Sequence, residues 1–261
     1  MSVVELASGR QVHYWEQGSG PVLLLIAGLG SPKGSWAAAM ARLSDTFRCI
    51  AIDNRDAGEN VEERAGYSIA DMADDCAAFL RALGIERASV AGSSMGGFIA
   101  LHLTLNYPLL VDRLILVGTA AAVPSGIAAP VEADWAPDTL ERARRRLPQT
   151  VAPGFFEAHP ERLEEMAAET AQNNMTFAGY ARQSAAITET HDVRSRLEEI
   201  LQPTLVVHGD ADAAVPLAAG EELARGIAHA RLEVLPNVGH LPHRETPDAF
   251  AALVREFLTA E

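Results

Sequence analysis

The segment Gly92-Ser93-Ser94-Met95-Gly96 has the residue types and the spacing of a nucleophilic serine site. It matches the pattern G-x-S-x-G with Ser94 at the centre, and it lies between a short apolar run, 88–91, and a helical pattern, 98–105. A nucleophile held on a sharp turn between a strand and a helix needs glycines, because the strained turn has no room for larger side chains. The alternative interpretation is a Gly/Ser-rich turn without chemistry. The order strand, turn, helix favours the nucleophile.

A serine hydroxyl is a weak nucleophile unless a histidine removes its proton and a carboxylate orients that histidine. On a turn of this kind the partners follow in the order Ser, Asp, His, and we expect each just after a later strand. The apolar run 204–207 is followed by Asp212, and the run 232–235 is followed by His240. We therefore predict that Ser94, Asp212 and His240 form a catalytic triad.

Two neighbouring aspartates could supply the acid of this triad. In the segment Gly209-Asp210-Ala211-Asp212, the spacing from Gly209 favours Asp212. Asp210 is instead expected to hydrogen-bond locally within the turn, as short acidic side chains often do.

The chain has eight histidines, but only His240 and His243 lie in the loop after the last predicted strand. His240 directly follows a glycine, which suits a tight loop that brings the imidazole over the nucleophile. We expect His243 at the surface or behind the site. His102, in the helix after the serine, is expected to be structural, and for His208, at a strand end, a core role is favoured over a chemical one.

The negative charge that develops when serine attacks a carbonyl needs two backbone N–H donors. Met95, the residue after the nucleophile, is predicted to supply one of them. The loop 28–30, which follows the apolar run 22–27, is predicted to supply the other, with Leu29 as the donor.

The segment 28–34 is rich in glycine and also resembles a nucleotide-binding turn. A dinucleotide fingerprint fails because the third glycine is one residue late and Pro32 interrupts the turn. A P-loop fails because Lys33 precedes Gly34 instead of following it. No H-x-x-x-H pattern or Cys/His cluster supports a metal, and the acidic segment 53–56 is expected to brace the loop beside the oxyanion site. The sequence therefore implies no cofactor and no metal.

Short apolar runs bounded by turn residues recur along the chain and indicate strands buried on both faces of a parallel sheet. Helical patterns lie between several of them, so we expect a mostly parallel α/β sheet covered on both sides. Two alternating segments at the start, 3–7 and 11–17, predict an antiparallel hairpin. The apolar runs are Val22–Ala27, Cys49–Ile52, Ala88–Ala91, Leu114–Val117, Thr204–Val207 and Leu232–Leu235.

Two of the expected helices have clear starting signals. Ser68 and Asp71 form a capping signature before an apolar stripe that runs from 69 to 83 at three- and four-residue spacing. Pro247 is expected to begin the last helix, whose stripe runs from 250 to 258.

From about residue 122 to residue 192 there is no convincing strand, only helix-forming sequence interrupted by prolines. We interpret 122–192 as a helical cap, or lid, inserted in a single core domain made of 1–121 and 193–261. Large apolar side chains of the cap are candidates for the substrate pocket, although each could equally pack the cap onto the sheet. They are Trp135, Phe155, Phe156, Met166, Met175, Phe177 and Tyr180.

Composition excludes several classes of protein. The chain has 261 residues, of which 21 are Lys or Arg and 35 are Asp or Glu, so its formal charge is 21 − 35 = −14. That charge repels nucleic acid, and the run 144–146 of three arginines is expected to be a solvated helix face. No apolar run approaches the roughly 18 residues of a membrane span, and no signal peptide is evident. Cys49 and Cys76 suit reduced core positions, so we expect a cytoplasmic protein. We expect it to be a monomer or a homodimer.

Taken together, these motifs resemble the α/β-hydrolase superfamily over essentially the whole chain. The resemblance implies an eight-stranded sheet with a helical cap between the sixth and seventh strands. Serine as nucleophile separates the chain from haloalkane dehalogenases and epoxide hydrolases, which use Asp. The matching features are Gly28-Leu29-Gly30, Trp36, the segment from Asp53 to Gly58, the Ser94 turn, Gly209 to Asp212, Gly239-His240 and Glu245-Thr246-Pro247.

Within the superfamily, the run Ser94-Met95-Gly96-Gly97, the short cap and the stretch 179–181 look most like 3-oxoadipate enol-lactonases and related small esterases. The chain departs from many members at Ala27, where they carry His, and at Asp56, where they carry Gly. An enol-lactonase would also need cationic contacts for its substrate's carboxylate, and the sequence assigns no particular arginine to that role.

We therefore predict a serine hydrolase that cleaves a carboxylic ester or lactone of a small, partly apolar molecule through an acyl-enzyme on Ser94. The same triad could also support C–C cleavage of a diketone or formation of a peracid. A third hypothesis, from another class, is a ligand-binding or sensory protein that keeps the fold without catalysis.

Overall fold

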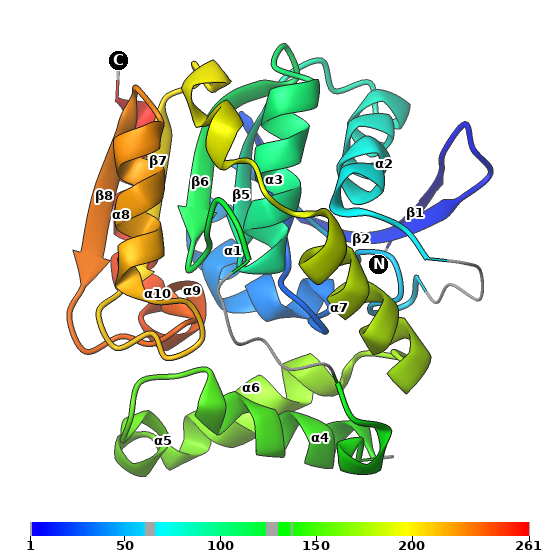
Figure 1. The fold of residues 1–261 in the computed structure, drawn as a ribbon, viewed down its shortest axis with the longest axis vertical. Coiled ribbons are helices and arrows are strands. Elements are labelled where there is room, and N and C mark those ends of the chain that lie inside the picture. The colour runs from blue at the N-terminus through cyan, green and yellow to red at the C-terminus, as the bar shows by residue number, and fades with distance from the viewer. Residues whose placement is uncertain (1, 61–65, 124–129, 137, 261) are drawn as a thin grey trace.

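One sheet of eight strands organises the computed structural model, which describes residues 2–60, 66–123, 130–136 and 138–260. The strand order is β1-β2-β4-β3-β5-β6-β7-β8, and the sheet is parallel from β4 to β8 (Figure 1). The first two strands pair antiparallel with each other, and β2 pairs antiparallel with β4, so the predicted hairpin is confirmed. The strands are β1 (Ser2–Glu5), β2 (Gln11–Gln17), β3 (Val22–Ile26), β4 (Arg48–Ile52), β5 (Ala88–Ser93), β6 (Val111–Val117), β7 (Thr204–Gly209) and β8 (Ala230–Leu235).

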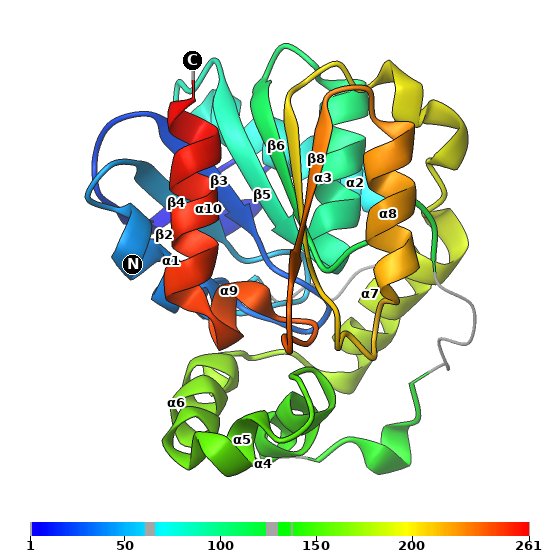
Figure 2. The same cartoon turned by 90° about the vertical axis from the view of Figure 1, so that its left-hand side faces the viewer.

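Helices cover both faces of this sheet, which is why its central strands are almost continuously apolar. One apolar cluster joins one face to α2, α3 and α8, and a second joins the opposite face to α1 and α10 (Figure 2). The mostly parallel α/β architecture is therefore confirmed. The helices of this core are α1 (Ala37–Leu43), α2 (Ile69–Ala82), α3 (Met95–Asn106), α8 (Leu217–Gly226), α9 (Pro242–Glu245) and α10 (Pro247–Thr259).

The edge strand β8 differs from the expectation that every apolar run is buried on both faces. In the part of the chain that the structure describes, it pairs with β7 alone. None of its residues is fully buried: Arg231 and Val234 are exposed, Val234 by 41%, and the others are partly buried. An edge strand lacks a neighbour on one side, so an apolar run there does not imply complete burial.

The two predicted helix starts are confirmed. The Ser68 hydroxyl accepts from the Asp71 N–H while the Asp71 carboxylate accepts from the Ser68 N–H, which is a complete capping box at α2. Pro247 is the first residue of α10, where the missing N–H of proline costs no hydrogen bond.

Among the described residues, four α-helices lie between β6 and β7, where the resemblance implied a cap: α4 (Thr139–Arg146), α5 (Phe155–Ala158), α6 (Pro160–Ala171) and α7 (Phe177–Thr190). Figure 1 shows α4, α5 and α6 as a layer facing the ends of the strands to which the arrowheads of β6 and β8 point. An isolated bridge between Ala122 and Asp192 joins the two segments of chain that flank these helices. None of the helices in the described ranges is long and apolar enough to cross a membrane.

Candidate active site

The turn between β5 and α3 holds Ser94 in a strained backbone conformation. Its φ of 54° and ψ of −121° lie in a region that residues with a side chain rarely adopt. The glycines on either side are required by close backbone approaches. A Cβ on Gly92 would lie 2.1 Å from the carbonyl oxygen of Gly96, and a Cβ on Gly96 would lie 2.1 Å from that of Ile26. The strand, sharp turn and helix predicted from the sequence are therefore present.

The loops after β7 and β8 bring a carboxylate and an imidazole together. Asp212 Oδ2 lies 2.8 Å from His240 Nδ1, and both side chains are buried. Asp212 Oδ1 accepts from the N–H groups of Ala214 and Val215, both at 2.8 Å. Burial alone would raise the pKa of the Asp212 carboxyl, but hydrogen bonds from His208 and His240 hold that pKa well below its usual range. The carboxylate therefore stays charged and fixes the imidazole.

The neighbouring Asp210 has a different environment. Its side chain is exposed, and its Oδ1 accepts from the N–H of Asn237 at 2.7 Å. Of the two acids weighed from the sequence, Asp212 is therefore the one that contacts His240, while Asp210 ties two loops together.

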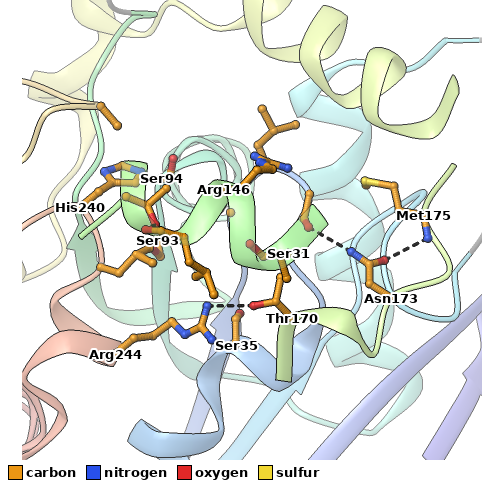
Figure 3. A pocket seen from close by; sticks show the side chains of 18 of the residues that line it. Ser31, Ser35, Ser93, Ser94, Arg146, Thr170, Asn173, Met175, His240 and Arg244 are labelled. Atoms are coloured by element: carbon orange, nitrogen blue, oxygen red, sulfur yellow. Dashed lines mark hydrogen bonds between the residues drawn. The ribbon is translucent and has the colours of Figure 1, made fainter. Parts of the chain in front are cut away.

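Ser94 and His240 line the same cavity, which has a volume of about 350 Å³ and lies between the sheet and the cap. Figure 3 shows these two residues on one side of the cavity, with Asn173 and Met175 on the other. A serine and a histidine that open onto one largely apolar cavity are the arrangement a small-molecule site requires.

The two expected oxyanion donors flank the serine. Met95 is the first residue of α3, so its N–H belongs to the positive end of a helix. Leu29 lines the cavity, and the loop that carries it runs against the nucleophile, because a Cβ on Gly28 would lie 3.2 Å from Ser94 Cβ. Asn54 Nδ2 donates to the carbonyl oxygen of Ala27 at 2.8 Å, so the acidic segment 53–56 braces this loop as expected.

Of the predicted pocket residues of the cap, Trp135 and Met175 line the cavity. The other candidates, all within the described residues, are not among its lining. Phe155, Phe156 and the fully buried Met166 pack in a small apolar cluster inside the cap. The rings of Phe177 and Tyr180 pack against the Trp135 ring, the first edge-on and the second tilted, with centroids 5.9 and 5.2 Å away. These four aromatic side chains therefore support the cap or the Trp135 ring and do not form the cavity wall.

The arginine run 144–146 is also different from the expected solvated face. Arg144 and Arg145 are exposed and pair with Glu164 and Glu141, but Arg146 lines the cavity and lies over the Tyr180 ring at 4.7 Å. The reason is helical geometry, because only one residue of three consecutive ones can face the same side of a helix.

Three arginines line the cavity, although no sequence pattern predicted any of them there. Arg142 and Arg146 are four residues apart on one face of α4, and Arg244 comes from α9. Burial and then the charge of Arg146 lower the pKa of Arg142 below its ordinary value. Within the described residues, neither Arg142 nor Arg146 has an ion-pair partner and no carboxylate lines the cavity. The i, i+4 spacing was the only signal of this shared face in the sequence.

Two histidines near the site are buried. His243 was expected at the surface or behind the site, and it proves to be 2% exposed and packed on the Trp36 ring at a centroid distance of 4.2 Å. Burial lowers the pKa of His243 far below its ordinary value, which favours the neutral imidazole. His208 is completely buried, as a core role requires, with Nε2 2.9 Å from the Val215 carbonyl and 3.4 Å from Asp212 Oδ2.

The loop that carries His240 is held by a buried carboxylate. Glu245 accepts from the N–H groups of Gly239 and Leu241, on either side of the histidine, and from the N–H of Ala152 in the cap. Burial raises the pKa of Glu245 above its ordinary value, although these three N–H groups oppose that effect. Among the described residues, no group of three His, Cys, Asp or Glu side chains is arranged to hold a metal ion.

Fold and site together define a hydrolase built on a parallel sheet with a nucleophile turn. The chain belongs to the α/β-hydrolase fold family, whose sequence profile matches residues 21–247. It is 31% identical over 239 residues to 3-oxoadipate enol-lactonase 2 of Acinetobacter baylyi, a match that covers 90% of this chain and 87% of that protein. It is also 33% identical over 276 residues to a 2-hydroxymuconate semialdehyde hydrolase of Pseudomonas putida, covering 97% and 92%.

The fold is also similar to that of a solved structure. The crystal structure of the enol-lactonase from Burkholderia xenovorans LB400 superposes with a TM-score of 0.88 at 30% identity, covering 99% of this chain and all of that one (100%). The resemblance to the α/β-hydrolase superfamily, and to enol-lactonases within it, is therefore confirmed.

Proposed function

We propose that this chain is a serine hydrolase that cleaves a carboxylic ester or lactone through an acyl-enzyme on Ser94. One observation carries the proposal: the strained serine opens onto the same cavity as His240, whose other ring nitrogen is bonded to the buried Asp212. That order of groups is what converts a hydroxyl into a nucleophile.

The mechanism takes two steps. His240 removes the proton of Ser94 Oγ as the oxygen attacks the carbonyl carbon, and the N–H groups of Leu29 and Met95 stabilise the resulting oxyanion. The tetrahedral intermediate then collapses, and His240 gives its proton to the leaving alkoxide or enolate. Water, deprotonated by His240, attacks the acyl-enzyme and releases the free acid and the serine.

We further propose that the substrate carries a carboxylate. Arg142 and Arg146 bring two positive charges to an otherwise largely apolar cavity, and neither forms an ion pair with a residue that the structure describes. Guanidinium groups bind carboxylates through charge-assisted hydrogen bonds, and these are strongest where water is scarce. A small anionic ester or lactone satisfies the arginines, while the apolar walls take its hydrocarbon part.

The test compares two aryl esters of similar size, p-nitrophenyl butyrate and p-nitrophenyl hydrogen succinate, together with a panel of lactones. We expect turnover that disappears in Ser94→Ala, and a lower KM for the carboxylated ester. Arg146→Gln is expected to raise that KM at least tenfold with little change for the butyrate. The matched control Arg145→Gln, on the exposed side of the same helix, is expected to change neither.

One outcome would replace the proposed chemistry, and another would change only the proposed substrate. Turnover of a dienoic diketone, without hydrolysis of any ester or lactone, would favour a C–C hydrolase on the same triad. An equal effect of Arg146→Gln on both esters would remove the carboxylate from the proposed substrate and leave the ester chemistry standing.

A further inference from the structure

Two amide side chains of the cap segment hold the residue next to the proposed oxyanion donor Leu29. The N–H of Gly30 donates to Gln183 Oε1 at 2.9 Å, and Asn173 Nδ2 donates to the carbonyl oxygen of Gly30 at 3.0 Å. Gln183 comes from α7 and is completely buried, and Asn173 precedes that helix and is 7% exposed. Both peptide groups of Gly30 are therefore bonded to side chains that lie between β6 and β7 in the chain.

Each amide also reaches a second loop of the core. Gln183 Nε2 donates to the carbonyl oxygen of Arg55 at 2.5 Å. Asn173 Oδ1 accepts from the N–H of Gly58 at 2.7 Å and from the N–H of Met175 at 3.2 Å, and Figure 3 shows the latter bond. Because two N–H groups need an acceptor and one carbonyl needs a donor, only one orientation of the Asn173 amide satisfies all of them.

Helix α7 is itself anchored to the same core loop. Arg182 makes two hydrogen bonds to the carboxylate of Asp56, whose side chain is 1% exposed and which also accepts from the hydroxyl of Tyr67. The cap residue that follows, Gln183, is therefore held at a fixed position relative to the loop it contacts.

The geometry of the turn from Gly28 to Ser31 links the direction of the Leu29 N–H to the contacts of Gly30. Gly28 O accepts from the N–H of Ser31 at 3.1 Å, and Gly30 adopts a φ of +68°, as the third residue of a tight turn can when it is glycine. A trans peptide is planar, so the N–H of Leu29 points away from the carbonyl of Gly28 and away from the inside of the turn. The 28–29 peptide that carries the Leu29 N–H and the 29–30 peptide held by Gln183 share the Cα of Leu29 within this one turn. A shift of Gly30 would therefore turn the Leu29 N–H, in the loop that runs against Ser94.

We infer that Gln183 and Asn173 are positioning residues, which fix the Gly28–Gly30 loop so that the Leu29 N–H is held ready for the oxyanion. The inference rests on the proposed function, because it assigns a task within that reaction. The cap then has a second role besides covering the substrate: it completes the part of the site that stabilises the transition state. Removing one well-placed oxyanion donor costs about 10²–10³ in kcat, so partial misplacement should cost less.

The experiment changes one of the two amides at a time. Asn173→Asp keeps the oxygen that accepts from Gly58 and Met175 but loses the donor to Gly30, and Gln183→Met removes both bonds of its amide. The matched control is Asn174→Asp, which makes the same chemical change at an exposed neighbouring residue. Active sites are titrated with a fluorophosphonate, so that kcat refers to folded, reactive enzyme. Affinity for phenylboronic acid, which forms a tetrahedral adduct with an active serine, is measured in parallel.

We expect both variants to lower kcat per titrated site by roughly tenfold to a hundredfold, with KM within threefold of wild type. The inhibition constant of the boronic acid should rise by a similar factor, while Asn174→Asp matches wild type in all three measurements. A role confined to folding would instead reduce the number of titrated sites and leave kcat per site unchanged.

The inference is overturned if kcat per site stays within twofold of wild type, or if KM alone rises, since the amides would then shape only the substrate cavity. These results are distinct from failure of the proposed function itself. If the wild-type enzyme neither reacts with the fluorophosphonate nor hydrolyses any ester or lactone, the proposed function and this inference fail together.

Discussion

Replacing Glu245 by glutamine tests whether this buried carboxylate holds the catalytic loop. Glu245 Oε1 accepts from the N–H groups of Gly239 and Leu241, both at 3.1 Å, and Oε2 accepts from Ala152 at 2.8 Å and Gly239 at 3.0 Å. A glutamine has one acceptor oxygen and an NH2 group that can only donate. In either orientation, one backbone N–H loses its acceptor: that of Ala152 or that of Leu241.

The expected loss of stability follows from the one backbone N–H group that loses its acceptor. A buried donor left without a partner costs about 1–3 kcal/mol. For a protein of this size, each kcal/mol lowers Tm by roughly 2–4 °C, so Glu245→Gln should lower Tm by about 2–12 °C. Because two of the three N–H groups flank His240, kcat should fall as well, with KM changed less.

Thermal unfolding followed by circular dichroism, and ester hydrolysis at 25 °C, measure the two effects. The control is Glu256→Gln on α10, where the carboxylate is 65% exposed and its ion pair with Arg231 should contribute at most about 1 kcal/mol. A Glu245→Gln enzyme with the Tm and kcat of wild type would refute the argument, because it would mean that the three N–H groups do not depend on this carboxylate.

Two further predictions concern the acid of the proposed triad and the buried His191. Asp212→Asn should lower kcat by about 10⁴, since the imidazole would be held in the wrong tautomer, whereas Asp210→Asn should stay within about threefold of wild type; the reverse order of effects would move the acid to Asp210. Burial lowers the pKa of His191 from 6.5 to about 4, so the unfolded chain binds a proton in this interval that the native protein does not. The free energy of unfolding should therefore fall as pH drops from 6.5 to 4, by on the order of 3.5 kcal/mol from this group, because a pKa difference of one corresponds to about 1.4 kcal/mol. When the free energy of unfolding is measured with urea at several pH values, it should depend less steeply on pH in His191→Gln than in wild type. An equal pH dependence in the two proteins would contradict the lowered pKa of His191.

The sheet, and the loops that carry Ser94, Asp212 and His240, could be predicted from the sequence because both depend on short-range patterns of residue type and spacing. Central strands are buried on two faces, so they are apolar throughout and easy to recognise. The nucleophile turn needs glycines at set distances from Ser94, and the acid and base follow later strands in a fixed order. Asp212 and His240 could therefore be singled out from eight histidines and 35 acidic residues.

The cap could not be predicted to the same depth, because the direction in which each of its helices faces depends on tertiary packing. Phe155 and Arg146 lie on helices that could turn either side toward the sheet. The sequence offered the aromatic ring as a pocket candidate, with packing inside the cap as an equal alternative, and it did not offer the guanidinium. In the structure the ring packs inside the cap and the guanidinium faces the cavity. The hydrogen bond between Gln183 and Gly30, which are 153 positions apart, has no sequence pattern that could predict it.

The most direct test of the proposed chemistry is the mass of the protein after reaction with a fluorophosphonate, followed by peptide mapping. The mechanism predicts a single phosphonyl group on Ser94, absent in Ser94→Ala and formed far more slowly in His240→Gln, because the imidazole must take the proton. Labelling at another residue, or an unmodified protein that still hydrolyses esters, would contradict an acyl-enzyme on Ser94.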